Sequence, residues 1–342
     1  MKISIIIPSY NRANYIIQTL ESVLNQTSDA WDCFIVDDGS TDQTEELVRT
    51  FMQKYSDKPF YWMKNQRTKG AQGARNTGLL QSKGEYLIFL DSDDILDKHC
   101  IAHRLDMAKQ NAEYQVWAFP VRLFNEKIGD SQKIWNFMNK KIDLLDRFLL
   151  HDAPWQTLGC LWSRNAIIQI GMWDERVTSL QDWDAHIQAV IHPNVQVWLD
   201  PNERDFDAFY RVGSYDSISK KFATRKGAET NFYLVDKTVD HLKTNGVFNH
   251  HLPAFRRFLW IMGTLISIAD NGLGKEFYNK YKDYYQFSGF SKTLYAFYAN
   301  KRFDMNFPKI GRGILSKIPD LFPLKETLNR EDTCMNITDK EV

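Results

Sequence analysis

The sequence predicts an α/β protein with a mostly parallel sheet flanked by helices, followed by a C-terminal helical region. Three observations support this fold class. Short apolar runs alternate with helical periodicity as far as residue 110, as in parallel strand–helix–strand units. Aspartate clusters follow the ends of two of these runs. After residue 220 the spacing of apolar residues is helical, and many of them are aromatic.

The N-terminal elements follow this alternation in order. The apolar run 3–7 is stopped by Pro8 and is expected to form a strand buried on both faces. Helical spacing then links Ile16, Leu20, Val23 and Leu24. Further along the chain we expect strands at 33–36, 60–63 and 86–90 and helices at 45–55 and 74–81, with Ser40 or Thr41 capping the helix at 45–55.

The remainder of the chain is less regular. Between 114 and 213 we expect a strand at 116–124 and helices near 142–150 and 182–190. A boundary near 220 is marked by small residues and two lysines. We therefore divide the chain into a domain at 1–220, a helical region rich in aromatic and basic residues at 221–318, and a polar tail at 319–342.

The charge balance limits which classes of partner the protein can bind. The 43 basic and 43 acidic side chains sum to zero, which argues against a protein that binds nucleic acid over its whole surface. The distribution is uneven, with net charges of −6 over 1–220, +9 over 221–318 and −3 over 319–342. The basic stretch 275–318 suits peripheral contact with an anionic membrane. A solvated face and a homodimer surface are the alternatives.

The cysteines and apolar runs bear on location. Four cysteines without CxxC spacing indicate a reducing compartment. The N-terminal apolar run is too short for a secretion signal, and the longest apolar run, 258–269, is too short to span a membrane. We therefore expect a cytoplasmic protein, with a peripheral position on the inner face of the cell membrane as an open alternative.

The first candidate site combines the ends of the first two expected strands, because ligands of parallel sheets bind beyond the carboxyl ends of strands. After Pro8, Tyr10 offers a ring that can stack on a base. Asp37 and Asp38 can accept hydrogen bonds from a base N–H or from ribose hydroxyls. The alternative interpretation is a turn in which aspartate caps the next helix.

The second candidate site is the run Asp91-Ser92-Asp93-Asp94 after the expected strand at 86–90. Three carboxylates in four residues repel one another unless a cation is bound. Alternate residues of an extended segment face the same way, so Asp91 and Asp93 can address one site. Hard oxygen ligands suit Mg²⁺ or Mn²⁺. An exposed acidic turn is the alternative.

Three more candidates lie elsewhere in the domain. Arg75, within the glycine-rich segment 70–78, can balance carboxylates or a diphosphate. Asp182 begins an expected helix, and Arg211 precedes a loop at 213–219 and could contact phosphate. Each has a structural alternative: a helix packed on the sheet, a capped amphipathic helix and a surface turn.

The order and spacing of four segments, SIIIPSYNR, FIVDDGSTD, GAQGARNTG and GEYLIFLDSDD, resemble the family 2 glycosyltransferases, most of which are inverting enzymes with the Rossmann-like GT-A fold. The resemblance covers roughly 1–220 and is most specific over 3–94. It implies that 1–220 is a domain that binds a nucleotide-sugar and carries out catalysis. It assigns donor-binding residues, which are Pro8, Tyr10, Asp37 and Asp38 for the nucleoside and Arg75 near the diphosphate.

The resemblance also implies the metal and the base. Asp91 and Asp93 match the family's DxD motif, with Asp93 the stronger candidate for direct metal contact. Asp182 matches the catalytic base. Gln181 stands where the family usually has glutamate, which removes a like charge that could raise the pKa of Asp182. Arg211 belongs to a stretch similar to one that closes over the donor.

These assignments predict a metal-dependent inverting glycosyltransferase of the hexosyl- or N-acetylhexosaminyl class, with Mg²⁺ or Mn²⁺ as cofactor. It would move sugar from a nucleotide-diphosphate sugar, with a UDP-sugar as leading candidate, to a hydroxyl of a glycan or lipid-linked acceptor. Capsule or lipopolysaccharide is the expected polysaccharide. A sugar nucleotidyltransferase is disfavoured because a glycine-rich loop does not follow the first strand. A non-catalytic nucleotide- or glycan-binding protein is the third hypothesis.

Overall fold

The computed structural model describes residues 1–213 and 224–284. These residues fall into two compact units, the first at 1–148 with 152–213, and the second at 149–151 with 224–284. The expected boundary near 220, the polar tail 319–342 and the part of the basic stretch from 285 to 318 lie outside the described residues. Each unit is therefore described by itself.

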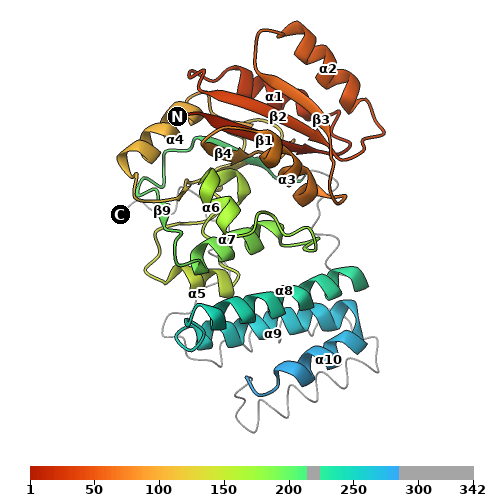
Figure 1. The fold of residues 1–342 in the computed structure, drawn as a ribbon, viewed down its shortest axis with the longest axis vertical. Helices are drawn as coiled ribbons and strands as arrows, with labels where there is room; N and C mark the ends of the chain where they lie inside the picture. The colour runs from red at the N-terminus through yellow and green to blue at the C-terminus, as the bar shows by residue number, and fades with distance from the viewer. Residues whose placement is uncertain (214–223, 285–342) are drawn as a thin grey trace. The chain divides into compact units, whose positions relative to one another are not determined.

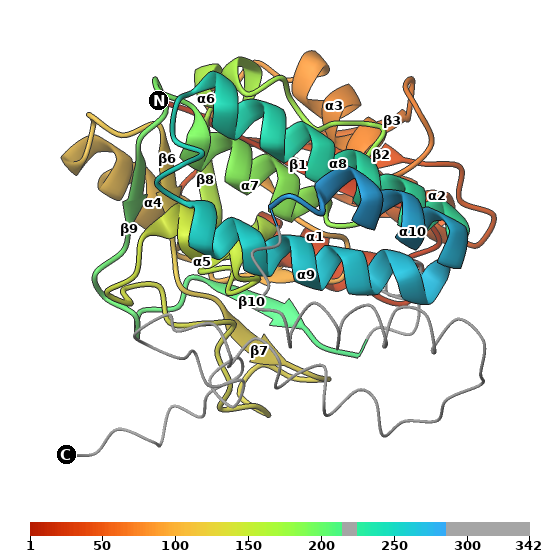
Figure 2. The same ribbon diagram turned by 90° about the horizontal axis from the view of Figure 1, so that it is seen from below.

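The first unit is built on a seven-stranded sheet with the order β3-β2-β1-β4-β8-β6-β9. Figure 1 labels β1 to β4 and β9, and Figure 2 labels β6 and β8. β8 is antiparallel to both of its neighbours, and the other pairs are parallel. The strands are β1 Ile3–Ser9, β2 Trp31–Asp37, β3 Phe60–Lys64, β4 Tyr86–Phe89, β6 Val116–Ala118, β8 Cys160–Ser163 and β9 Val197–Leu199. The predicted α/β fold with a mostly parallel sheet is confirmed.

Helices and a second, smaller sheet complete this unit. The smaller sheet has the order β5-β10-β7, with β10 antiparallel to β5 and parallel to β7. Its strands are β5 Ile95–Leu96, β7 Arg122–Phe124 and β10 Ala208–Arg211. The helices are α1 Ile16–Leu24, α2 Thr44–Lys54, α3 Ala71–Gln81, α4 Cys100–Gln110, α5 Leu144–Leu149, α6 Arg164–Gln169 and α7 Gln181–Ile191, with a 3₁₀ turn at Thr157–Gly159.

Pro8 lies inside β1 instead of stopping it. β1 pairs with β2 over its whole length, from Ile3 to Ser9, whereas its pairing with β4 ends at Ile6. The carbonyl of Ser9 accepts from the N–H of Asp38, directly after β2, so the neighbouring Pro8 presents its backbone toward the β4 side. There the strand pairing has already ended, and the missing N–H of proline costs no ladder hydrogen bond.

The expected strand at 116–124 is wrong, because two strands in different sheets occupy this stretch. β6 ends at Ala118 and β7 begins at Arg122. Pro120 lies between them and lacks the N–H that a continuous central strand would need. The split lets this segment serve both the large sheet and the small one.

The start of α2 also differs from expectation. Ser40 and Thr41 do not cap this helix. Instead Asp42 accepts a hydrogen bond from the N–H of Thr44 at 3.0 Å. The hydroxyl of Ser40 accepts from the N–H of Asn11 at 3.0 Å, which ties the loop after β2 to the loop after β1. The small polar residues therefore serve a loop–loop contact rather than a helix cap.

Helix α3 begins at Ala71, three residues earlier than expected, and lies very close to the sheet. Gly70 has φ +132°, which lets the chain turn into the helix. A Cβ on Gly78 would lie 2.5 Å from a methyl of Ile6 on β1, and one on Gly73 would lie 1.9 Å from the carbonyl oxygen of Thr68. The glycines of the 70–78 segment thus allow close packing, which fixes the position of Arg75 between them.

The second unit contains three helices that pack side by side, α8 Arg225–Thr244, α9 Leu252–Ala269 and α10 Asn271–Tyr281 (Figure 2). The 18 residues of α9 have a mean hydropathy of 1.3, so by length and composition alone this helix could cross a membrane. The apolar run 258–269 underestimates the length of this helix, because α9 starts at Leu252. However, 44% of the helix is buried within the protein, and a buried core helix has the same composition.

Candidate active site

Three loops at the carboxyl ends of parallel strands form the candidate site. β1 lies between β2 and β4, with Ser9 beside Asp37 and Ile6 beside Phe89 (Figure 1). The residues that follow these strands must therefore leave the same edge of the sheet. This arrangement brings together the first and second candidate sites of the sequence.

The loops after β1 and β2 are joined by side-chain hydrogen bonds. Asn11, at φ +51°, accepts from the N–H of Thr41 at 2.8 Å. The buried carboxylate of Asp37 accepts from the N–H groups of Gly39 and Ser40 at 3.1–3.3 Å. Asp37 therefore shapes its own loop and does not cap α2, so the capping alternative does not describe this residue.

The other predicted nucleoside residues differ in accessibility. Pro8 is buried within β1. Tyr10 is 45% exposed, and the ammonium of Lys69 lies 5.2 Å from its ring centroid. Asp38 is half-buried and accepts from Asn65 Nδ2 at 2.7 Å. Among the four residues predicted to bind the nucleoside, Tyr10 and Asp38 are the two whose side chains are at least partly exposed.

Residues 91–94, here called the acidic turn, form a tight turn rather than an extended segment. The N–H of Asp94 donates to the carbonyl of Asp91 at 3.1 Å. Burial still alternates: the side chains of Asp91 and Asp93 are 37% and 14% exposed, whereas Ser92 and Asp94 are buried. Asp91 and Asp93 can therefore reach a common site, although the reason differs from the one expected.

Asp94 differs from Asp91 and Asp93 in its burial and in its hydrogen-bond partner. One of its oxygens accepts from the N–H of Arg211 at 2.9 Å, and the other has no hydrogen-bond partner among the described residues. Burial first, then the charges of Asp93 and Asp91, raise its pKa well above the usual value. A raised pKa lets Asp94 take up a proton more readily, which would lessen the repulsion expected among three carboxylates.

Arg211 lies against the acidic turn, and its guanidinium is engaged by protein groups. Nε donates to the carbonyl of Asp93 at 2.9 Å, Nη2 to Gln18 Oε1 at 2.8 Å and Nη1 to the carbonyl of Asn125 at 3.2 Å. The group also lies 4.4 Å from the ring centroid of Phe124. This geometry supports a positioning role for Arg211 and gives no support to the expected phosphate contact.

Arg12 is a cation near this turn that received no role from the sequence. Its side-chain Nε lies 3.9 Å from an Asp93 carboxylate oxygen. Its backbone N–H donates to Thr44 Oγ1 at 2.8 Å. The available signal was its place directly after PSYN at the end of the first strand. Arg12 thus adds positive charge beside Asp93.

Arg75 links the acidic turn to the start of α7. Its buried guanidinium donates to Asp91 Oδ1 at 2.7 Å and to Gln181 Oε1 at 3.0 Å. The indole of Trp173 lies beneath it, 4.4 Å from the guanidinium carbon. One side chain therefore joins residues that are about 90 positions apart, Asp91 and Gln181.

Asp182 stands in the first turn of α7, after Leu180, which has the left-handed φ of +56°. Its carboxylate accepts from the N–H of Trp183 at 2.9 Å. Burial raises the pKa of Asp182. The Trp183 N–H and the charge of Arg75 partly oppose this rise, and the charge of Asp91 adds to it. A raised pKa increases the proton affinity of a carboxylate, which suits a general base.

Glu175 is a structural organiser that the sequence did not identify. Its carboxylate accepts from Arg67 Nε, from the N–H of Thr68 at 3.2 Å and from Asn76 Nδ2 at 2.8 Å. Burial alone would raise its pKa, but these hydrogen bonds outweigh it and lower the pKa to about 2. Asn76 also binds the backbone of Trp173, so this group holds the indole under Arg75.

The tryptophans near the site are part of the core. Indole faces suit sugar rings, but core packing is the leading expectation for the four tryptophans in 150–185, and all four are buried: Trp155, Trp162, Trp173 and Trp183. Tyr210 on β10 is only partly buried and packs edge-on against Trp135. Burial raises the pKa of Tyr210, and the charges of Asp94, Asp91, Asp93 and Asp182 add to this. The Tyr210 hydroxyl therefore lies within electrostatic reach of both the acidic turn and the predicted base.

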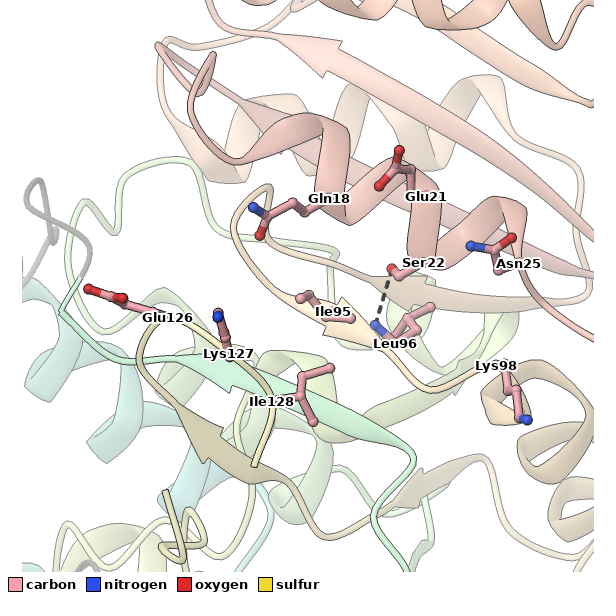
Figure 3. Close-up of a pocket in the computed structure, with 10 residues that line it drawn as sticks. All are labelled: Gln18, Glu21, Ser22, Asn25, Ile95, Leu96, Lys98, Glu126, Lys127 and Ile128. Atoms are coloured by element: carbon pink, nitrogen blue, oxygen red, sulfur yellow. Dashed lines mark hydrogen bonds between the residues drawn. The ribbon is translucent and has the colours of Figure 1, made fainter. Parts of the chain in front are cut away.

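A cavity of about 470 Å³ lies beside α1 and β5 and is distinct from these carboxylates (Figure 3). Its lining has mixed charge and consists of Gln18, Glu21, Ser22, Asn25, Ile95, Leu96, Lys98, Glu126, Lys127 and Ile128. Gln18, the partner of Arg211, belongs to this wall. The cavity thus borders the contacts that support the acidic turn.

Comparison with known proteins agrees with this arrangement. Residues 4–168 match the model described as glycosyl transferase family 2. The chain is 43% identical over 105 residues to the Escherichia coli enzyme UDP-Glc:alpha-D-GlcNAc-diphosphoundecaprenol beta-1,3-glucosyltransferase WfgD, covering 31% of this chain and 38% of that protein. The chain spans between 15% and 63% of the lengths of the curated relatives that it matches.

Two solved structures share the fold. S. aureus TarS 1-349 in complex with UDP-GlcNAc aligns with a TM-score of 0.58 at 17% identity, over 83% of this chain and 88% of that one. Mannosyltransferase PcManGT from Pyrobaculum calidifontis in complex with GDP-Man and Mn²⁺ aligns with a TM-score of 0.54 at 15% identity, over 92% and 83%. The family match over 4–168 therefore identifies this part of the chain, slightly less than half of its residues, as a region of glycosyl transferase family 2.

Proposed function

We propose that this protein transfers a sugar from a nucleotide-diphosphate sugar to a hydroxyl group of a glycan or lipid-linked acceptor in polysaccharide biosynthesis. The reaction would invert the anomeric centre and depend on a divalent metal. The donor would be a UDP-sugar, since the name of WfgD specifies UDP-Glc for that enzyme and TarS 1-349 was solved with UDP-GlcNAc. The WfgD name also specifies a diphosphoundecaprenol-linked acceptor.

The contact that best supports this proposal is the bridge made by Arg75. It joins Asp91 at the end of β4 to Gln181, the neighbour of Asp182. A group that would bind the donor and a group that would accept a proton are thereby held next to one another. Such proximity is what a transfer reaction requires.

The acidic turn has the chemistry to hold Mg²⁺ or Mn²⁺. Asp91 and Asp93 are partly exposed, and their carboxylates supply the hard oxygen ligands that these ions prefer. Mg²⁺ commonly takes one or two carboxylates together with substrate phosphates. When bound, the ion would stabilise negative charge on the leaving diphosphate. The bound Mn²⁺ in the PcManGT complex supports the choice of metal.

The protein's own residues would perform the remaining steps. The Tyr10 ring and Asp38 would bind the nucleoside, and Arg75 would stabilise charge that develops on the diphosphate. Asp182 would take the proton from the acceptor hydroxyl as that oxygen attacks the anomeric carbon. The bond from that carbon to the diphosphate breaks on the opposite face, which inverts the centre without a covalent intermediate.

The decisive experiment measures donor use directly. The protein is incubated with a panel of UDP-, GDP- and dTDP-sugars and Mn²⁺, and binding and slow donor hydrolysis are recorded with and without EDTA. Binding of one donor with metal-dependent hydrolysis supports the proposal. Release of pyrophosphate from a nucleoside triphosphate and a sugar phosphate would identify a nucleotidyltransferase instead. Loss of donor binding in Asp93→Ala, but not in Asp106→Ala on α4, would support the metal site.

A further inference from the structure

The side chain of Gln181 makes two contacts of opposite polarity. Its Oε1 accepts from Arg75 Nη1 at 3.0 Å, and its Nε2 donates to the carbonyl of Thr178 at 3.4 Å. A glutamate could accept from Arg75 but has no N–H for Thr178. The local geometry therefore suits an amide at this position better than a carboxylate.

The neutral amide changes the charge balance around Arg75. The guanidinium is 5% exposed, and of the two site residues to which it donates, only Asp91 is anionic. Its Nε is buried without a hydrogen-bond partner among the described residues. A guanidinium stays protonated in proteins, so a second carboxylate at position 181 would further offset its charge.

We propose that Gln181 is a positioning residue that fixes the Arg75 guanidinium without neutralising it, so that Arg75 keeps positive charge for the diphosphate of the donor. This inference rests on the proposed function, because it assumes that a nucleoside diphosphate binds beside the acidic turn. It concerns the diphosphate and leaves the contacts of the nucleoside unchanged. The effect of position 181 should thus depend on whether the ligand carries phosphate.

The test compares a nucleoside diphosphate with its own nucleoside. UDP, GDP and dTDP are titrated against the wild-type protein by calorimetry, and the tightest binder is paired with uridine, guanosine or thymidine. Gln181→Glu should weaken binding of the diphosphate about tenfold and change binding of the nucleoside less than about twofold. Gln169→Glu, on the exposed side of α6, adds the same charge and should leave both affinities unchanged.

A second variant separates charge from contact. Gln181→Met removes the oxygen that Arg75 contacts but adds no charge, and should weaken diphosphate binding only about threefold. Equal losses for Gln181→Met and Gln181→Glu, or equal losses of nucleoside and diphosphate binding, would overturn the role of neutrality. Unchanged diphosphate binding in Gln181→Glu would do the same while leaving the proposed function intact. A wild-type protein that binds no nucleotide would overturn both proposals.

Discussion

Two buried arginines contact the acidic turn, and they differ in what they bind. Arg75 donates to side-chain oxygens of Asp91 and Gln181, beside the predicted base. Arg211 donates to backbone carbonyls and to Gln18. Both guanidinium carbons lie 4.4 Å from an aromatic ring centroid, and both side chains are buried. Burial and stacking therefore do not distinguish the two, whereas the chemistry of their partners does.

Because their partners differ, Arg75 and Arg211 are expected to have different roles. The partners of Arg75 are groups of the proposed reaction, so its charge should influence binding and turnover. The partners of Arg211 are backbone carbonyls of two loops and the Gln18 side chain of α1, so its loss should lower stability first. Substitutions at Asp182, Arg75, Arg211 and Glu175 test this distinction.

The largest effect is expected on the Arg75 side, at Asp182. Asp182→Asn removes the group that would accept the proton and should lower the transfer rate about a thousandfold. Nucleotide affinity should remain within about threefold of wild type, because the amide keeps the shape of the side chain. Acceptor-dependent transfer and nucleotide binding are measured on the same preparation. Transfer at the wild-type rate would remove Asp182 from the mechanism.

The second-largest effect is expected for a substitution of Arg75 itself. Arg75→Lys keeps a positive charge but cannot donate to Asp91 and Gln181 in the same fork, so turnover should fall about a hundredfold. The comparison predicts a larger change in turnover than in melting temperature. Steady-state kinetics and thermal unfolding of this variant provide the check. A variant that melts much earlier but turns over normally when folded would make Arg75 structural, like Arg211.

The third effect tests the other arginine. Arg211→Lys leaves carbonyls of the loops without donors and should lower the free energy of unfolding by about 3 kcal/mol. Nucleotide binding by the folded protein, measured well below the melting temperature, should change less than about threefold. Chemical denaturation and calorimetry decide this. A hundredfold loss of diphosphate affinity with unchanged stability would return Arg211 to the phosphate-binding role that the sequence suggested.

The smallest effect concerns Glu175, which supports Trp173 under Arg75. Glu175→Gln should cost about 2 kcal/mol of stability at neutral pH, because charged hydrogen bonds are lost. The folded pKa is lowered to about 2, so this stabilisation is present above the unfolded pKa of 4.5 and is lost as pH falls toward 2. Denaturation at several pH values checks the sign. A cost that is the same at pH 3 and pH 7 would contradict the role of the charge.

Much of the fold could be predicted because its strands are short, buried runs. β1 and β2 are buried at every residue, and their apolar sequences are visible without a structure. The division of 116–124 into β6 and β7 could not be predicted, because it depends on which sheet each half joins. Periodicity describes one segment at a time and does not identify its neighbour.

The candidate site was predictable to a similar degree. The aspartates at strand ends are recognisable because parallel strands share an edge. The hydrogen bond that distinguishes Asp94 from Asp91 and Asp93 comes from Arg211, 117 positions further along the chain. The roles of Arg211 and Glu175 are set by partners from distant segments, which neither composition nor spacing specifies. Tyr210 was overlooked for the same reason.

The glycines of α3 have a consequence for changing what this protein recognises. A methyl on Gly78 would overlap Ile6, so the helix cannot shift without moving the sheet beneath it. The position of Arg75 relative to the sheet is therefore fixed by the packing of α3. Each glycine in this helix lowers its intrinsic stability by about 1 kcal/mol relative to alanine. Mutant libraries that seek a new donor or acceptor should spare α3 and vary the exposed loop at 125–130, where added volume meets solvent rather than backbone.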